Sequence, residues 1–155
     1  MPLHFTPQSI WNWRFDISRD DAEPLAEIWL SSIRNRGTIT LGDLTIGISI
    51  RGLLKPSMSF NVDERTIATG AYASMWRTRL WLESSGQHYE LHGRKLGQAL
   101  EVYRGGQAIG MITKRGLTRK GSVDLPSDVP LQDRLFLIAQ ALYSWKRQAS
   151  AAAAS

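Results

Sequence analysis

Large apolar residues alternate with polar ones along much of the chain. In residues 11–18 and 44–51 every second position is large and apolar, and residues 58–62 repeat the pattern. Alternation with a period of two places the apolar side chains on one face of a strand and the polar ones on the other. Related runs predict further strands at residues 25–31, 36–39, 66–72, 76–82, 88–91, 99–103, 108–113 and 122–125.

Short polar turns separate these predicted strands. Gly42-Asp43, Ser84-Ser85-Gly86 and Arg104-Gly105-Gly106 are examples, and such combinations are typical of tight hairpin turns. Many short strands joined in this way indicate an antiparallel meander, so we expect a barrel of about twelve strands. We expect the N-terminal residues around His4 to be mobile.

The pattern changes near the end of the chain. Residues 127–130, Ser-Asp-Val-Pro, combine a capping side chain with a proline and predict a helix start. From Leu135 to Trp145 only Gln140 and Ser144 interrupt the apolar run. A helix that is apolar all round belongs in an interior, and this segment would be about 16 Å long. We therefore predict that the barrel encloses a central helix, with Lys146 and Arg147 at its C-terminal end.

The chain of 155 residues fits a single domain. We assign residues 1–148 to this mainly β domain and the alanine- and serine-rich residues 149–155 to a disordered tail. The first residues lack the charged start and apolar run of a signal peptide. No stretch has the roughly 20 apolar residues that cross a bilayer, so we expect a cytoplasmic protein without a transmembrane segment.

Several chemistries are excluded or disfavoured by the composition and the motifs. The chain has no cysteine, which excludes disulfides, thiolate metal sites and cysteine nucleophiles. It also contains no phosphate-binding loop, dinucleotide fingerprint, GxSxG elbow or HExxH helix. We therefore expect a protein that is not an enzyme and that needs no cofactor.

The net charge of +5 is concentrated in one part of the sequence. Between residues 94 and 120 there are seven basic residues and a single acidic one, Glu101. The basic residues are Arg94, Lys95, Arg104, Lys114, Arg115, Arg119 and Lys120. Cations on neighbouring turns can bind anionic phospholipid headgroups or a membrane surface, and we expect these to share one rim. The alternative is a set of solvated turns whose charge only keeps the protein soluble.

A weaker metal-site hypothesis rests on His88, Glu90 and His92. Residues two apart on a strand share a face, and imidazole and carboxylate groups are suitable zinc or iron ligands. The alternative is that Tyr89 and Leu91 face the core, which leaves the other three side chains on a solvated outer face. We favour this second interpretation.

The layout resembles the tubby C-terminal-like fold, in its LURP-one-related and scramblase-like branch. The resemblance covers roughly residues 36–147. It rests on segments 87–91 and 105–112, and on Asp124-Leu125-Pro126 before an apolar helix that ends in Tyr143-Ser144-Trp145-Lys146-Arg147. It implies a barrel filled by its helix, and members resembling tubby bind phosphoinositide headgroups through surface lysine and arginine. The chain lacks the cysteine cluster and adjoining transmembrane helix of a scramblase, which argues against scrambling.

Three functional hypotheses follow from these observations. The first is a binding module, peripheral at the membrane, that meets anionic lipid through the basic rim. The second is a structural or assembly protein that acts through a protein partner or as a homo-oligomer. The third is a small metal-dependent enzyme that uses His88, Glu90 and His92. Nucleic acid is disfavoured because the alternation turns the aromatic residues toward the core, away from a stacking platform.

Overall fold

The computed structural model describes residues 2–9, 12–20, 23–74, 77–94, 97–116 and 118–154. It is mainly β, with one C-terminal helix, α1 (Leu131–Ala154). The strands are β1 (Leu3–Pro7), β2 (Trp13–Arg19), β3 (Ala26–Leu30), β4 (Arg36–Leu41), β5 (Leu44–Arg51), β6 (Ser57–Val62), β7 (Arg65–Ser74), β8 (Arg79–Ser84), β9 (Gln87–Arg94), β10 (Ala99–Arg104), β11 (Gln107–Lys114) and β12 (Gly121–Asp124).

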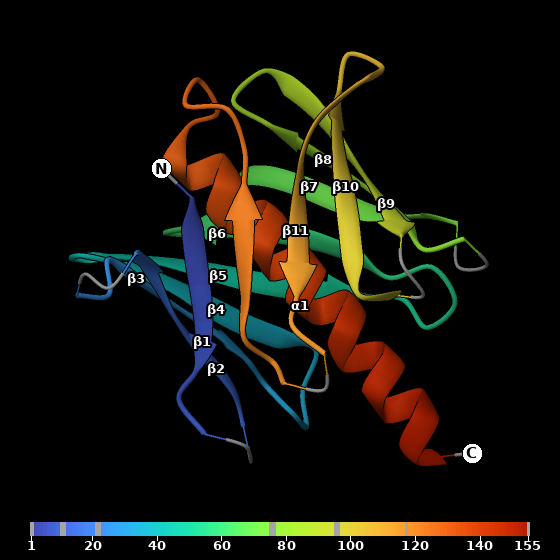
Figure 1. Ribbon diagram of the computed structural model, residues 1–155. Helices are drawn as coiled ribbons and strands as arrows, with labels where there is room; N and C mark the ends of the chain where they lie inside the picture. Colours follow the sequence, from blue (N-terminus) through green and yellow to red (C-terminus); the bar gives the residue numbers. More distant parts are fainter. Residues whose placement is uncertain are drawn as a thin grey trace.

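The strands form a closed barrel with the simplest possible connectivity (Figure 1). Each strand pairs antiparallel with the strands before and after it in sequence, and β12 pairs with β1. The predicted fold class, an antiparallel barrel of about twelve strands with a C-terminal helix, is confirmed, and the strands number twelve. Two tryptophans at positions 11 and 76, which open two of the alternating runs, lie outside the described residues.

Closure of the barrel depends on the N-terminal strand that the sequence analysis missed. His4 lies in β1 and not in a mobile segment, and its neighbours Leu3 and Phe5 are fully buried. Phe5 is paired with Gly121 of β12. A Cβ atom at Gly121 would lie 2.2 Å from the Phe5 ring, so only glycine lets the two strands meet here. The alternation of Leu3 and Phe5 was the available signal, but it covers too few residues to stand out.

Helix α1 is buried around its whole circumference between Leu135 and Trp145. All residues from Leu135 to Trp145 are at most 6% exposed. Phe136 stacks on Phe60 of β6 with ring centroids 4.4 Å apart, and Trp145 lies 5.8 Å from the ring of Phe5. Strand and helix side chains therefore form one hydrophobic core. The placement of the helix on the barrel axis stays a prediction.

Side chains along the helix form hydrogen bonds with two strands and one connection of the barrel. The buried carboxylate of Asp133 accepts hydrogen bonds from the hydroxyls of Ser84 (2.5 Å) and Tyr89 (2.8 Å). Further along, the Gln140 amide donates to the carbonyl of Trp81 (2.8 Å). Near the other end, the Trp145 indole donates to the carbonyl of Gly97 (2.7 Å). Because a buried polar group is costly without a partner, these bonds favour one position of the helix along the strands.

The helix extends beyond the predicted apolar segment at its C-terminal end. It begins at Leu131, directly after Pro130, and continues to Ala154. The disordered tail predicted for residues 149–155 is therefore helical as far as Ala154, in keeping with the high helix propensity of alanine. Lys146 and Arg147 lie within the helix and not at its end. In the described part of the chain, no helix combines the length and apolar character needed to span a membrane.

From the Tyr89–Asp133 hydrogen bond we predict how the stability of the protein changes at alkaline pH. Burial, together with this bond and the nearby carboxylate charge, raises the pKa of Tyr89 well above its usual range. The unfolded tyrosine therefore loses its proton first, so stability present below about pH 10 is lost as the pH rises further. We expect the Tm to fall above this pH, and to fall less steeply in Tyr89→Phe. Burial also raises the pKa of Tyr72, which accounts for a remaining slope.

At neutral pH the same Tyr89→Phe substitution removes a hydrogen bond to a carboxylate. We expect a loss of about 1.5–3 kcal/mol in the free energy of unfolding. Urea titration at neutral and alkaline pH measures both effects. An unchanged alkaline slope in the variant would contradict the assignment of Tyr89.

Candidate functional site

The up-and-down topology sends successive connections to opposite ends of the barrel. The β1–β2, β3–β4, β5–β6, β7–β8, β9–β10 and β11–β12 connections lie together at one end. Helix α1 begins at the other end, and its C-terminal half lies toward this one, where Figure 1 marks the C-terminus. We call this end of the molecule the basic end because of the charged residues in its connections.

Every charged residue in the connections at the basic end is a cation. The sequence of these six connections contains no aspartate or glutamate. Their described cations are Arg34, Lys55, Arg77, Arg115, Arg119 and Lys120. Helix α1 adds Lys146 and Arg147, and burial together with Arg147 lowers the pKa of Lys146. The positive charge is thus gathered from segments spread over the whole sequence.

The opposite end carries the opposite charge, and we call it the acidic end. Its connections contain no lysine, arginine or histidine in their sequence. Their described acidic residues are Asp20, Glu23, Asp43, Asp63, Glu64 and Asp128. The N-terminus of α1 lies here, and its positive dipole end is stabilised by carboxylates. The molecule therefore has a charge separation along the barrel.

The seven cations predicted to share one rim are divided by the structure. Arg104 ends β10 at the acidic end and forms an ion pair with Asp128 at 3.0 Å. Arg94 ends β9 at the basic end, but it pairs with Glu101 at 3.1 Å and donates to the Tyr103 hydroxyl at 3.0 Å. Lys95 lies outside the described residues. The prediction that these cations share one rim is wrong, because β10 runs the length of the barrel and separates Arg104 from Arg94.

Two of the four cations near the β11–β12 connection have structural contacts. The guanidinium of Arg119 donates to the carbonyls of Ser9 and Asn12, both at 2.7 Å, and lies 5.0 Å from the ring of Trp13. It thereby joins this connection to the β1–β2 connection, and partial burial lowers its pKa. Lys114 lies with its ammonium 5.8 Å from the ring of Trp145.

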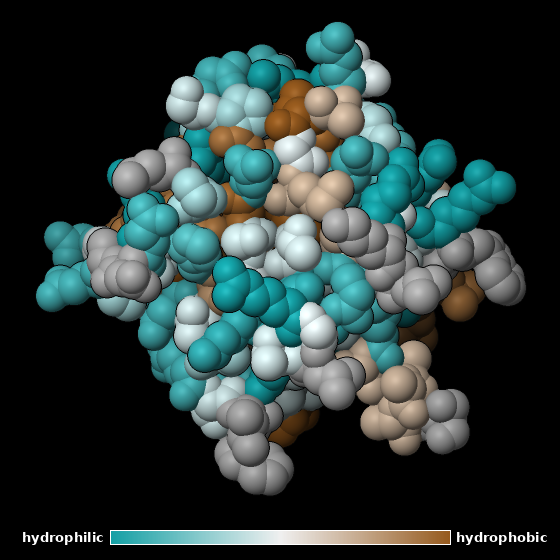
Figure 2. Space-filling view, in the orientation of Figure 1, coloured by the Kyte–Doolittle hydropathy of each residue, from teal (hydrophilic) through white to brown (hydrophobic). Residues whose placement is uncertain are grey.

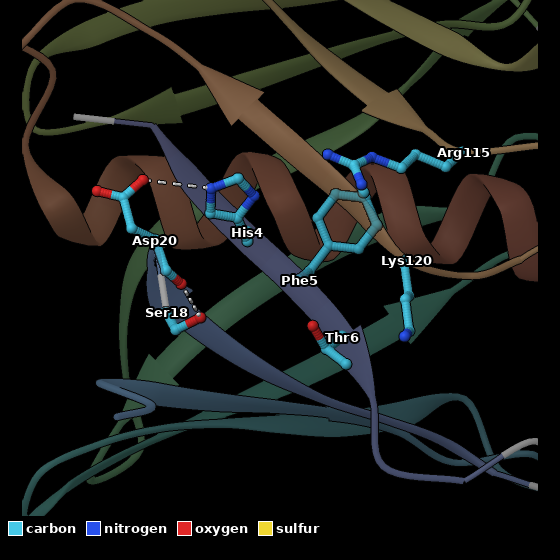
Figure 3. Close-up of a pocket in the computed structure, with 8 residues that line it drawn as sticks. His4, Phe5, Thr6, Ser18, Asp20, Arg115 and Lys120 are labelled. Carbon is cyan, nitrogen blue, oxygen red and sulfur yellow. Dashed lines mark hydrogen bonds and ion pairs between the residues drawn. The ribbon is translucent and has the colours of Figure 1, made fainter. Parts of the chain in front are cut away.

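Arg115 and Lys120 are the cations of this group that are exposed to solvent. Neither has an ion-pair partner within the described part of the chain. Both line a pocket of about 380 Å³ on the outer surface beside β1. In Figure 3 they lie on one side of Phe5 and Thr6, and the pair formed by His4 and Asp20 lies on the other. This pocket places two unpaired cations beside a hydroxyl, which suits an anionic group.

The three candidate metal ligands lie on the outer face of β9, as the favoured interpretation predicts. Tyr89 and Leu91 are buried between them. His88 pairs with Glu83 at 2.5 Å, and His92 pairs with Glu90 at 3.2 Å and packs on Tyr103. Four residues along a strand separate the two imidazoles by about 13 Å, too far to share an ion. The described residues contain no group of three side chains that could hold a metal ion.

Comparison with known proteins gives no relative for this chain. No family model, curated protein or solved structure matches it. The resemblance to the tubby C-terminal-like fold therefore stays a prediction, and the function is argued from the site alone.

A comparison of Arg119 with Lys120 tests which cations are structural. We expect Arg119→Ala to lower the free energy of unfolding by about 1.5–3 kcal/mol, because two carbonyl groups lose a charged donor. Lys120→Ala, one residue away and exposed, should change it by less than about 0.5 kcal/mol. Thermal and urea unfolding measure both variants. Equal stability of the two variants would contradict the bracing role of Arg119.

Proposed function

We propose that this protein is a binding module that attaches to anionic phospholipid surfaces through the basic end of the barrel. The observation that carries the proposal is the separation of charge between the two sets of connections. A surface of anionic headgroups attracts one end of such a molecule and repels the other. The charge therefore supplies orientation as well as affinity.

The magnitude of this attraction supports binding by several side chains together. Each lysine or arginine near an anionic membrane contributes about 1 kcal/mol, and the contribution decays within a Debye length. A single cation would therefore bind too weakly to hold the protein at the membrane. The exposed side chains of Arg34, Lys55, Arg115 and Lys120 belong to three connections of this end, β3–β4, β5–β6 and β11–β12. Because the three connections lie at the same end of the barrel, these side chains can act on one surface.

The pocket beside β1 supplies a place for an individual headgroup. Arg115 and Lys120 line it together with the Thr6 hydroxyl. Two cations and a hydroxyl are the donors that a phosphate group requires, because each phosphate oxygen accepts hydrogen bonds and carries negative charge. The pocket extends along β1 from Arg115 and Lys120 at the basic end to Asp20 at the acidic end. A headgroup of the bound surface would enter it from the side of the two cations.

Head-to-tail assembly is a second candidate function, favoured by the same charge separation. The basic end of one copy complements the acidic end of another, and a contact between two different patches builds rings or filaments. Such assembly would weaken as salt is added. Sedimentation velocity over a range of protein concentration at low salt measures it, and a strict monomer at every concentration would contradict it.

Charge reversal at the two ends tests the membrane proposal. We expect Arg115→Glu with Lys120→Glu to weaken binding to anionic vesicles about thirtyfold or more, because two attractive charges become repulsive. The matched control is Arg19→Glu with Arg65→Glu, which changes the net charge equally with exposed residues near the acidic end. The control should bind like the wild type. Co-sedimentation with vesicles measures all three proteins.

The two pairs of variants also separate orientation from bulk charge. If both pairs weaken binding equally, net charge alone matters and the basic end has no special role. If neither pair weakens it, the proposal is contradicted. Circular dichroism confirms that each variant retains the β structure.

A further inference from the structure

Three aliphatic side chains project into solvent at the basic end. Ile33 in the β3–β4 connection is 93% exposed, and Leu53 and Leu54 in the β5–β6 connection are 84% and 85% exposed. Among the described residues the remaining exposed large hydrophobic is Leu44 at 36%, the first residue of β5, at the acidic end. The rest of the surface is mainly hydrophilic in the view of Figure 2, with small hydrophobic areas between polar side chains. Exposed aliphatic side chains on loop tips are costly in water, so their position at one end requires a reason.

Hydrogen bonds hold the β3–β4 connection in shape. The Ser31 hydroxyl accepts from the backbone amides of Ile33 (3.3 Å) and Arg34 (3.0 Å). The amide of Ile50 donates to the carbonyl of Asn35 (3.0 Å), which joins the β3–β4 connection to the end of β5. These bonds fix the turn with Ile33 pointing outward. The exposed side chain is thus a feature of an ordered loop.

The helix supports the second connection. The guanidinium of Arg147 donates to the carbonyl of Leu53 at 3.4 Å and lies over the rings of Tyr72 and Tyr143. The two aromatic rings hold Arg147 beside the barrel, and Arg147 in turn meets the connection that carries Leu53 and Leu54. Because the connection is already ordered, moving these side chains out of water would cost little further conformational entropy of the loop.

Cations flank the aliphatic residues in both connections. Arg34 follows Ile33 directly and Lys55 follows Leu54, and both are exposed. Arg36 and Arg51 stand at the adjoining strand ends and are also exposed. Apolar tips surrounded by cations fit the boundary between acyl chains and anionic headgroups, where apolar burial and electrostatic attraction add. A second copy of the chain would bring its own cations to the same patch, which disfavours contact between two basic ends.

We propose that Ile33, Leu53 and Leu54 insert among the headgroups of an anionic phospholipid bilayer, with the acidic end of the barrel turned away from it. This inference rests on the proposed attachment through the basic end and names the residues that penetrate. The cations bring the barrel to the surface, and the three aliphatic side chains hold it there. Binding through them persists at salt concentrations that weaken the purely electrostatic contacts.

The absence of cysteine in the sequence makes a direct test possible. Leu54→Cys and, as a control at the acidic end, Asp43→Cys each carry one environment-sensitive fluorophore. Vesicles of phosphatidylserine and phosphatidylcholine are added at low salt, and binding is followed by co-sedimentation of the same samples. We expect a blue shift and quenching by brominated acyl chains for the label at position 54. The label at position 43 should keep its emission in water.

A second pair of variants measures the contribution of the side chains without any label. Leu53→Ser with Leu54→Ser should weaken vesicle binding by about tenfold or more, because two leucine side chains lose their burial. Leu44→Ser removes the exposed leucine of the acidic end and should leave vesicle binding unchanged. Because Leu53 and Leu54 are exposed, their replacement leaves the core intact.

The outcomes distinguish insertion from attachment. Co-sedimentation without a change at position 54 overturns the insertion and leaves the electrostatic attachment standing. No co-sedimentation of the wild type overturns both proposals. A blue shift at position 54 that appears without vesicles as protein concentration rises shows self-association through these loops, and it also overturns the insertion.

Discussion

Burial of an apolar helix is the constraint on which the rest of this structure depends. The segment from Leu135 to Trp145 is almost entirely apolar and is buried on every side. Its side chains share one hydrophobic core with the inward side chains of the strands. Hydrogen bonds join the helix to the barrel at several points, from Asp133 near one end to Trp145 near the other. Their bonds set how far the helix reaches along the strands and therefore where its C-terminal half emerges.

The topology that achieves this burial also separates the charges. In an up-and-down barrel alternate connections lie at opposite ends, so a sequence that alternates basic and acidic connections produces a molecule with two charged ends. The helix follows the same polarity, because its N-terminus lies among carboxylates and its C-terminal half carries Lys146 and Arg147. The proposed function is thus assigned to one end of the barrel. The exposed aliphatic side chains of Ile33, Leu53 and Leu54 lie at the end where the charge is positive.

The sequence predicted the fold well and the site only in part. Alternating residues and an all-apolar helix are local patterns, and both appear where they were expected. β1 was missed because its alternation is short, although Phe5 is needed to close the barrel. The site was harder to predict, because the cations were grouped by their positions in the sequence. This placed Arg104 with the others although β10 carries it to the opposite end of the barrel. It also missed Arg34 and Lys55, which lie in connections distant in the sequence. Whether a cation is free also depends on tertiary contacts, as the carbonyl partners of Arg119 show.

The central claim is that the basic end of the barrel binds anionic membranes. The most direct measurement is co-sedimentation of the wild-type protein with vesicles of increasing anionic lipid content, at low and at high salt. We predict no binding to neutral vesicles, binding that rises with the anionic fraction, and a lower affinity at high salt because the charges are screened. Binding that is absent at every lipid composition, or that is equal on neutral and anionic vesicles, would contradict the account.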